Sequence, residues 1–440
     1  MAGIILLVIS TIVFYATGGA SDGGKYLFEL PIYSTGTYNG VTVLEIITYH
    51  CLGLGFVSMA LRQTGKKATG SRAGEVFDSG VTTVSAYLLQ AVLGIVVTVV
   101  FAWLGSTIWE GAGILLPFGF GQGTGQALNY GSIYGSDEYV WGFASVGEGR
   151  SFGLTVAALG FLAACIGGVI YMNVRRKRGE IKICDGEETE KYTLDNIVGV
   201  DEIPMSGSVD KMSIQLSFVI GIYAVSFALM YGLSALVGEG LRATIFGFNF
   251  LLGTLLAVLI KSAIGGMSKK RLFKRRFINN FLMNRIGGFF FDFMIVAGIA
   301  AIRIDAIRNY WGVLLALAVV GTFATYLYVN VICKKLFPNY RHEQFLAWYG
   351  MLTGTASTGI ILLREIDSDF LTPAADNLVY QNLPAIIFGL PIMLLASYIY
   401  NGGPGAVYIT LGIVAVLFAI FQIVLFRRSI FKKKKQQTQE

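Results

Sequence analysis

Apolar runs, each long enough to cross a bilayer as a helix, recur along almost the whole chain and are separated by short polar segments. An apolar run of about 20 residues spans the hydrocarbon core as an α-helix, which satisfies its own backbone hydrogen bonds. The pattern predicts an all-α polytopic membrane protein with about ten transmembrane helices. We expect them near residues 2–18, 41–61, 80–104, 151–173, 213–236, 245–263, 287–304, 310–333, 382–400 and 405–427.

Two further apolar stretches, residues 105–134 and 345–365, differ from these spans because they are rich in glycine. Within "GMLTGTASTG" (350–359), seven of ten residues are Gly, Ser or Thr, and glycine and threonine lower the stability of a helix. Broken backbone survives at membrane depth only where protein or a watery cavity satisfies its polar groups. We therefore expect both stretches to be re-entrant hairpins, which return to the membrane face from which they came.

The Lys and Arg residues gather in alternate connections, and this alternation predicts a topology. The basic segments are 62–79, 174–212, 264–286, 334–344 and the tail 431–440. The intervening connections are nearly free of Lys and Arg, and the basic side of a membrane protein is usually cytoplasmic. The alternation holds only if both glycine-rich stretches are hairpins, the first entered from outside and the second from inside. Both termini are then expected in the cytoplasm.

The two halves of the chain carry the same order of parts. Each has a span that ends in an Arg-containing segment, then a long span, a glycine-rich hairpin and a further span. The copies start on opposite faces, and inverted repeats with broken segments near the midplane are typical of secondary transporters. We expect a first membrane repeat, a cytoplasmic linker (or, as the alternative, a small regulatory lobe), a second repeat, and an additional helix with a basic tail. Their boundaries are 1–173, 174–212, 213–400 and 401–440.

Composition narrows the class of protein further. Hydrophobic residues make up 54% of the 440 residues and charged residues 14%, against about a quarter charged in soluble domains. The net charge of +7 comes from clusters beside apolar runs, so it gives no reason to expect a nucleic-acid partner. Four scattered cysteines and two histidines form neither a metal motif nor a disulfide framework. We expect neither an enzyme nor a bound cofactor, and an ion channel is the alternative to a transporter.

The expected hairpins carry groups that suit small ligands. Glycine lets the chain turn sharply and lets a ligand approach the backbone. The N-terminus of a half-helix presents free N–H groups to an anion, and hydroxyl and carbonyl oxygens suit sodium. A cluster of Gly and Thr in an apolar chain has an alternative interpretation, which is a helix-packing face.

The candidate residues follow from this chemistry. In the first hairpin the expected substrate-binding residues are Gly121, Gln122, Gly123, Thr124, Gly125 and Asn129. Gln126 is a further neutral donor and acceptor there. In the second hairpin the expected substrate-binding residues are Ser357, Thr358 and Gly359. The expected sodium ligands in the hairpins are Thr124, Gly354, Thr355 and Ala356.

Arg364 follows the second hairpin by about one helical turn and has two interpretations. As a substrate-binding residue, it could clamp a carboxylate with two parallel hydrogen bonds. Alternatively, its long side chain could extend to the cytoplasm and pair with Glu365 or Asp367.

Three other polar residues are candidates for the sodium site: Asp292, Gln381 and Asn382. An ionisable group inside a span is a functional candidate by default, so Asp292 could bind sodium or a substrate ammonium, or lie at a hydrated helix end. Gln381 and Asn382 open the span after the second hairpin and could offer carbonyl oxygens to a cation. His50 is a further candidate because it matches the neighbourhood of Asp292 in the other repeat, with a packed neutral histidine as the alternative.

At the two glycine-rich stretches the chain resembles the sodium/glutamate symporter family. "GQGTG" (Gly121–Gly125) is similar to the family's first motif, and "GTASTG" (Gly354–Gly359) lies where its second motif belongs. The resemblance covers roughly residues 2–400. It implies sodium-coupled symport of glutamate or a related amino acid or carboxylate by an elevator-like movement, with Na+ as the coupling ion. A homodimer in the bacterial plasma membrane is expected, and a 2-hydroxycarboxylate-like anion is the alternative substrate.

The sequence departs from that family's pattern in three places. Family members usually have a span before the one at 2–18, so we expect the chain to lack the family's first helix. Residues 401–440 add a span beyond the family's usual end. Gln122 stands where a His is common, which puts glutamate itself in doubt as the substrate.

Overall fold

The computed structural model describes most of the chain, and the part that it describes is built from helices. The described residues are 2–19, 24–29, 41–62, 71–135, 142–181, 211–237, 245–269, 278–368, 371–403 and 405–427. Within these ranges, eight helices are long and apolar enough to span a membrane, and β pairing is confined to two isolated bridges. The prediction of an all-α polytopic membrane protein is therefore confirmed.

Two of the ten predicted spans are not among these eight helices. The span predicted at 2–18 is helix α1 (Ala2–Ala16), which has 15 residues. At 1.5 Å per residue it is about 22 Å long, shorter than the roughly 30 Å hydrocarbon core. The span predicted at 382–400 is α16 (Asn382–Asn401), which has 20 residues and Pro391 in its interior; the apolar helix that is fully described within it is Ile387–Asn401. A proline removes one helical hydrogen bond and disturbs the turn before it.

The chain folds into two compact units, each of which draws on both halves of the sequence. The first unit contains α1, α2 (Val43–Leu61), α8 (Lys211–Val237), α10 (Asn249–Lys269) and α11 (Asn280–Ala300). The second unit contains the remaining helices. Each unit thus combines helices from both predicted repeats. Most of the predicted linker 174–212 and the basic tail after residue 427 lie outside the described residues.

The start of α2 in the first unit follows directly from its sequence. Thr42 is the N-cap, and its hydroxyl accepts a hydrogen bond from the backbone N–H of Glu45 at 3.3 Å. The Glu45 carboxylate in turn accepts from the backbone N–H of Thr42 at 2.7 Å. This reciprocal capping box satisfies two of the donors that a helix N-terminus leaves free.

Packing between α2 and α11 in the first unit depends on small residues. A Cβ on Gly55 would lie 2.7 Å from the ring of Phe291, so only glycine permits this approach. Across the same contact, the Ser58 hydroxyl donates to the carbonyl of Met283 at 2.6 Å. Close approach through small residues, with hydrogen bonds between helices, is how helices associate in lipid.

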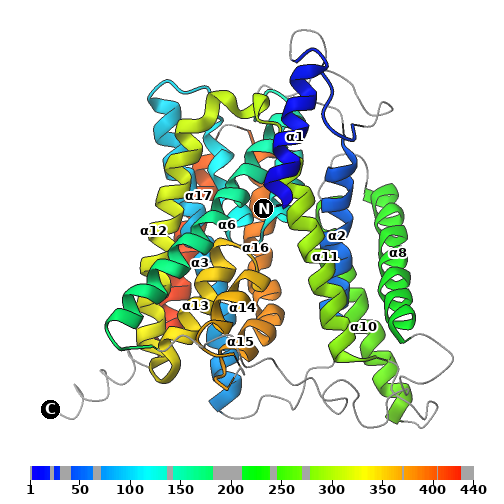
Figure 1. The fold of residues 1–440 in the computed structure, drawn as a ribbon, viewed down its shortest axis with the longest axis vertical. Helices are drawn as coiled ribbons and strands as arrows, with labels where there is room; N and C mark the ends of the chain where they lie inside the picture. The colour runs from blue at the N-terminus through cyan, green and yellow to red at the C-terminus, as the bar shows by residue number, and fades with distance from the viewer. Residues whose placement is uncertain are drawn as a thin grey trace. The chain divides into compact units, whose positions relative to one another are not determined.

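The second unit contains both glycine-rich segments. Its elements are α3 (Ser71–Trp103), η2 (Glu110–Ile114), α4 (Leu115–Phe120), α5 (Thr124–Ile133), α6 (Val146–Lys177), η3 (Asp305–Tyr310), α12 (Trp311–Leu336), η4 (Pro338–Tyr340), α13 (Arg341–Thr353), α14 (Ala356–Arg364), α15 (Ala374–Tyr380), α16 and α17 (Ala406–Leu425). The segment predicted at 105–134 forms η2, α4 and α5, and the segment at 345–365 falls in α13 and α14. α13 packs against α14 (Figure 1), and α4 packs against α5, so both segments are interrupted helices.

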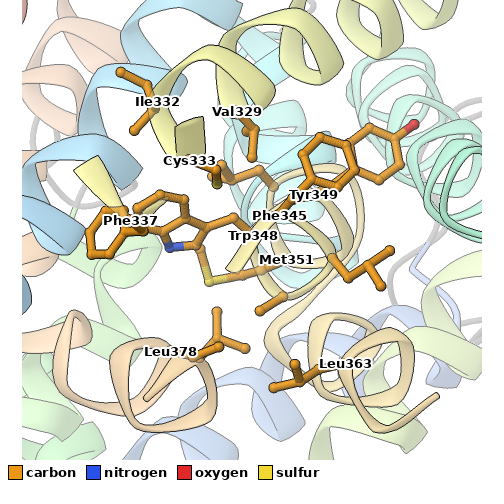
Figure 2. Close-up of a cluster of buried hydrophobic side chains, with 14 of the residues drawn as sticks. Val329, Ile332, Cys333, Phe337, Phe345, Trp348, Tyr349, Met351, Leu363 and Leu378 are labelled. Atoms are coloured by element: carbon orange, nitrogen blue, oxygen red, sulfur yellow. The ribbon is translucent and has the colours of Figure 1, made fainter. Parts of the chain in front are cut away.

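Large aromatic side chains of α13 form the centre of the main buried cluster in this unit (Figure 2). The ring of Phe345 stacks on that of Tyr171 from α6, with centroids 3.9 Å apart. The ring of Trp348 meets Phe337 edge-on at 5.1 Å. From His342 to Thr353 nearly every residue of α13 is buried. A helix that is covered on all sides can hold a polar break at its end in a fixed position.

The additional C-terminal helix, α17, is an integral part of the second unit. The Gln422 amide donates to the Ser85 hydroxyl of α3 at 2.5 Å and to the Tyr328 hydroxyl of α12 at 3.1 Å. Just after the helix, Arg427 forms an ion pair of 2.7 Å with Asp78 of α3. These contacts anchor α17 to the same helix, α3, that holds the two glycine-rich segments.

Candidate functional site

The first break separates α4 from α5 at Gly121–Gly123. Gly123 is the N-cap of α5 and has φ +81° with ψ −171°, a conformation that favours glycine strongly. As a glycine, the N-cap residue has no side chain with which to cap this helix start. The first N–H groups of a helix have no intrahelical partner and carry the positive end of its dipole. The start of α5 is therefore suited to an anionic group.

The second break separates α13 from α14 at Gly354 and Thr355. The Thr355 hydroxyl is the N-cap of α14: it accepts from the backbone N–H of Thr358 at 3.4 Å and lies 3.3 Å from the Thr358 hydroxyl. α13 and α14 touch through Gly350 and Gly359, since a Cβ on Gly350 would lie 2.7 Å from the Cα of Gly359. This break is closed by its own hydroxyl groups and by close backbone packing.

One face of α3 holds both breaks. The Tyr87 hydroxyl donates to the carbonyl of Gly121 at 3.1 Å, at the end of α4. Three residues later, the Gln90 amide donates to the carbonyl of Leu352 at 2.9 Å, at the end of α13. Residues three apart are neighbours on a helix surface. Carbonyls at the ends of two segments that are distant in sequence are thus bound side by side on α3.

α6 meets both breaks as well, at Gly160. A Cβ at this position would collide with the carbonyl oxygen of Thr353 and would lie 3.3 Å from the Cα of Phe120. These two residues are the last of α13 and of α4. α3 and α6 together bring the two breaks into one place within the second unit.

Unpartnered buried amides mark the first break. Gln126 is 1% exposed, and neither its Nε2 nor its Oε1 has a hydrogen-bond partner in the described part of the chain. Nε2 of Gln122 also has no hydrogen-bond partner among the described residues. Leaving one buried polar group unsatisfied costs about 1–3 kcal/mol. Three such atoms on two neighbouring side chains, Gln122 and Gln126, make the first break a candidate ligand site.

The predicted residues of the first hairpin lie together on α5 and at its start. Thr124 is fully buried and Asn129 is 5% exposed. In the second hairpin, Ala356, Ser357 and Thr358 form the half-buried first turn of α14. Gly359 instead packs closely against the backbone of α13, near the carbonyl of Ala347.

Arg364 lies at the other end of α14, where its side chain is exposed. It is eight positions after Ala356, which corresponds to about 12 Å along the helix. The geometry favours an exposed cation at a helix end over a carboxylate clamp at the break.

Gln381 is buried, but its oxygen is already used by the protein. Oε1 accepts from the Thr83 hydroxyl at 2.9 Å and from Trp348 Nε1 at 2.9 Å, and Nε2 lies 2.9 Å from the sulfur of Met351. A carbonyl oxygen has two lone pairs, so a sodium ion would have to displace one of these bonds. The side chain of Asn382 lies outside the described residues.

Asp292 belongs to the first unit, on α11, and its side chain is exposed. His50 is in the same unit, where its Nδ1 lies 3.0 Å from the Tyr223 hydroxyl. This hydrogen bond fits the interpretation of a packed histidine. The structure therefore gathers the hairpin candidates in one unit and places these two residues in the other.

A charged cluster lies at the base of α13, away from the breaks. Glu180 accepts from Arg341 at 2.9 Å and from Arg175 at 3.0 Å. Desolvation raises the pKa of the Glu180 carboxyl, but these two charges outweigh it and hold that pKa below its usual value. His342 Nε2 accepts from Arg341 Nε at 2.9 Å, and its Nδ1 lies 2.8 Å from the Tyr171 hydroxyl. The cluster fastens the end of α6 to the start of α13.

His342 in this cluster is neutral at pH 7. Desolvation and the charge of Arg341 lower its pKa to about 4. Its Nε2 lies 3.4 Å from a carboxylate oxygen of Glu180, which would be an ion pair only with a protonated ring. Because Nε2 already accepts an N–H from Arg341, it carries a lone pair and the contact is not an ion pair.

Three residues that build the site were not predicted from the sequence: Tyr87, Gln90 and Gly160. Tyr87 and Gln90 are polar positions three apart within residues 86–97, which are otherwise apolar, and this spacing was the available signal. Gly160 gives no signal of its own because α6 contains several glycines with different neighbours.

The chain has no match among models of known protein families and none among curated proteins. Its function is therefore inferred from the geometry of the two breaks.

Proposed function

We propose that the protein is a sodium-coupled secondary active transporter that carries an amino acid or related carboxylate. The observation that carries this proposal is the convergence of two helix breaks on α3 and α6. Gln90 and Leu352, which join one break to α3, are 262 positions apart in the sequence. Paired broken helices that meet inside a membrane protein are the usual way to bind an anion at helix N-termini and a cation at oxygen ligands.

In this proposal the two interrupted segments are re-entrant hairpins of an inverted repeat. The start of α5 binds the substrate carboxylate, and the hydroxyl-rich start of α14 contributes sodium ligands. Both breaks belong to the second unit, whereas α2, α8 and α11 of the first unit are continuous helices. That division supports an elevator-like movement, in which the unit that holds the ligand moves and the other stays in place.

Uptake into proteoliposomes tests the function. With an inward sodium gradient, we expect saturable uptake of at least one member of a panel of amino acids and dicarboxylates, and its loss when potassium replaces sodium. Uptake that rises linearly with substrate concentration and does not depend on the sodium gradient would point to a channel instead. An absence of sodium-dependent uptake across the panel would contradict the proposal.

Cysteine labelling tests the expected topology separately. In a background without native cysteines, Thr107→Cys lies just before η2 and Arg178→Cys just after α6, and both positions are exposed. We expect an impermeant maleimide to reach Thr107→Cys from outside only and Arg178→Cys from the cytoplasm only. Labelling of both from one side would contradict the hairpin assignment of η2, α4 and α5.

A further inference from the structure

The start of α5 combines two independent features that point to a ligand. The N-cap residue of the helix is Gly123, which has no side chain with which to cap it. In its first turn, Gln126 is 1% exposed, and both polar atoms of its amide lack a partner in the described parts of the chain. Helical side chains lean toward the N-terminus of their helix, so this amide projects toward the break. Buried polar groups are nearly always paired, which makes a ligand the expected partner.

The chemistry of the amide narrows the class of ligand. Gln126 offers N–H donors and a carbonyl acceptor side by side. A primary carboxamide satisfies both at once, because its oxygen accepts from Nε2 while its N–H donates to Oε1. A carboxylate has only acceptors, so it would leave Oε1 facing a negative oxygen. An ammonium group has only donors and would leave Nε2 unpaired.

We infer that Gln126 recognises the side-chain carboxamide of the substrate while the start of α5 binds the substrate's carboxylate. The substrate is then an amino acid of the glutamine or asparagine type, taken in preference to an acidic amino acid. This inference rests on the proposed function and narrows its substrate. Nε2 of Gln122, also without a partner in the described residues, supplies a second neutral donor at the same break.

Uptake of four amino acids by the wild-type protein tests the preference. The measurement is kcat/KM for L-glutamine, L-asparagine, L-glutamate and L-aspartate in proteoliposomes with an inward sodium gradient. We expect one of the two amides to exceed its matching acid by at least about tenfold, since a site built for a hydrogen-bonding group rejects analogues that lack it. Equal rates for amides and acids, or faster uptake of the acids, would overturn the inference.

Variants test the residue itself. Gln126→Leu should lower kcat/KM for the preferred amide by about 10- to 100-fold without lowering the melting temperature, because it removes an unsatisfied buried group. Gln126→Glu keeps the shape of the side chain but removes its N–H donors, so it should also lower uptake of the amide. It provides a second test if the leucine variant folds poorly. The control is Gln344→Leu: Gln344 is fully buried on α13 and its Nε2 likewise has no partner in the described residues, but its Oε1 accepts from Asn377 Nδ2 at 2.7 Å, so this variant also reports the cost of losing one buried hydrogen bond away from the first break. That control should leave the amide-to-acid ratio unchanged.

The outcomes separate this inference from the proposed function. Sodium-dependent uptake of acidic amino acids that Gln126→Leu does not alter would overturn the inference and leave a transporter. An absence of sodium-dependent uptake for every amino acid would overturn both.

Discussion

The two helix breaks of the second unit lie close together but differ in how the helix that follows each of them is capped. The first, before α5, begins at a glycine with positive φ, which has no side chain to cap the helix, and is followed by the amide of Gln126, which has no partner among the described residues. The second, before α14, is capped by the Thr355 hydroxyl, and its two helices touch through Gly350 and Gly359. The first break leaves side-chain polar atoms without a partner among the described residues, whereas the second has satisfied part of its own backbone.

The difference suggests a division of labour. An uncapped helix start with neutral amides suits the carboxylate and polar side chain of a substrate. A capped start with two hydroxyls offers oxygen atoms that can serve a cation, because a hydroxyl that accepts one hydrogen bond keeps a second lone pair. The comparison predicts that damage to the first break affects the substrate most, and damage to the second affects sodium.

The largest effect is expected from Gly123→Ala. Its φ of +81° places an L-residue in a strained conformation that costs about 1–3 kcal/mol, so the backbone at the break should relax away from the geometry that binds the ligand. Uptake should be nearly lost while the protein still purifies as a folded species. Gly354→Ala should reduce uptake less, because its φ is −135° and the nearest atoms to a new Cβ lie at 3.0 Å.

Gly179→Ala is the matched control for backbone strain. Gly179 has φ +70°, a Cβ added there would have no other atom within 4 Å, and the residue lies after α6, away from the breaks. Normal uptake in this variant, together with loss in Gly123→Ala, would assign the effect to the site. Equal losses in both variants would mean that general strain explains them.

Gly160→Ala should have the next largest effect. Its Cβ would press on Thr353 and Phe120 and force the two breaks apart, and such overpacking costs about 1–3 kcal/mol. We expect lower apparent affinity for substrate and sodium together, measured as uptake over a grid of both concentrations. Gly412→Ala in α17 is the control: a Cβ there would have no other atom within 4 Å, so uptake should be unchanged. If Gly160→Ala changes the apparent affinity for only one of the two ligands, the breaks do not form a shared site.

Replacement of the two threonines should give a smaller and more selective effect. Thr355→Val removes the cap of α14, which contributes about 0.5–2 kcal/mol, and should raise the sodium concentration for half-maximal uptake; Thr355→Ser should restore it. Thr124→Val, at the first break, tests whether that hydroxyl also serves sodium. If Thr355→Val changes the KM for substrate and leaves the sodium dependence alone, the proposed division between the breaks is wrong.

The smallest effect concerns pH and the cluster at the base of α13. His342 is neutral in the folded protein because its pKa is about 4, below the ordinary value of 6.5. The unfolded chain therefore takes up a proton first as the pH falls. Stability should be full above about pH 6.5 and decline toward pH 4, by at most about 1.4 kcal/mol per pH unit. Melting temperatures in detergent should show this decline in the wild type and a weaker one in His342→Gln; identical pH profiles would remove His342 as its source.

The sequence by itself determined the properties that depend on neighbouring residues. Apolar length predicts membrane-spanning helices because a helix closes its own hydrogen bonds. Glycine and threonine predict the two breaks because they weaken a helix locally, and both breaks appear at the expected residues. The capping pair of Thr42 and Glu45 and the length of the apolar helix α17 are likewise local features.

Only the tertiary structure decided how these parts are used. It placed both breaks in one unit and Asp292 in the other, and it engaged the oxygen of Gln381 with Thr83 and Trp348. It also left the amide of Gln126 buried without a partner among the described residues. Nothing in the neighbourhood of a glutamine shows whether its amide will be paired, because its partners come from helices that are distant in the sequence. Packing brings those helices together, and packing is a property of the whole unit.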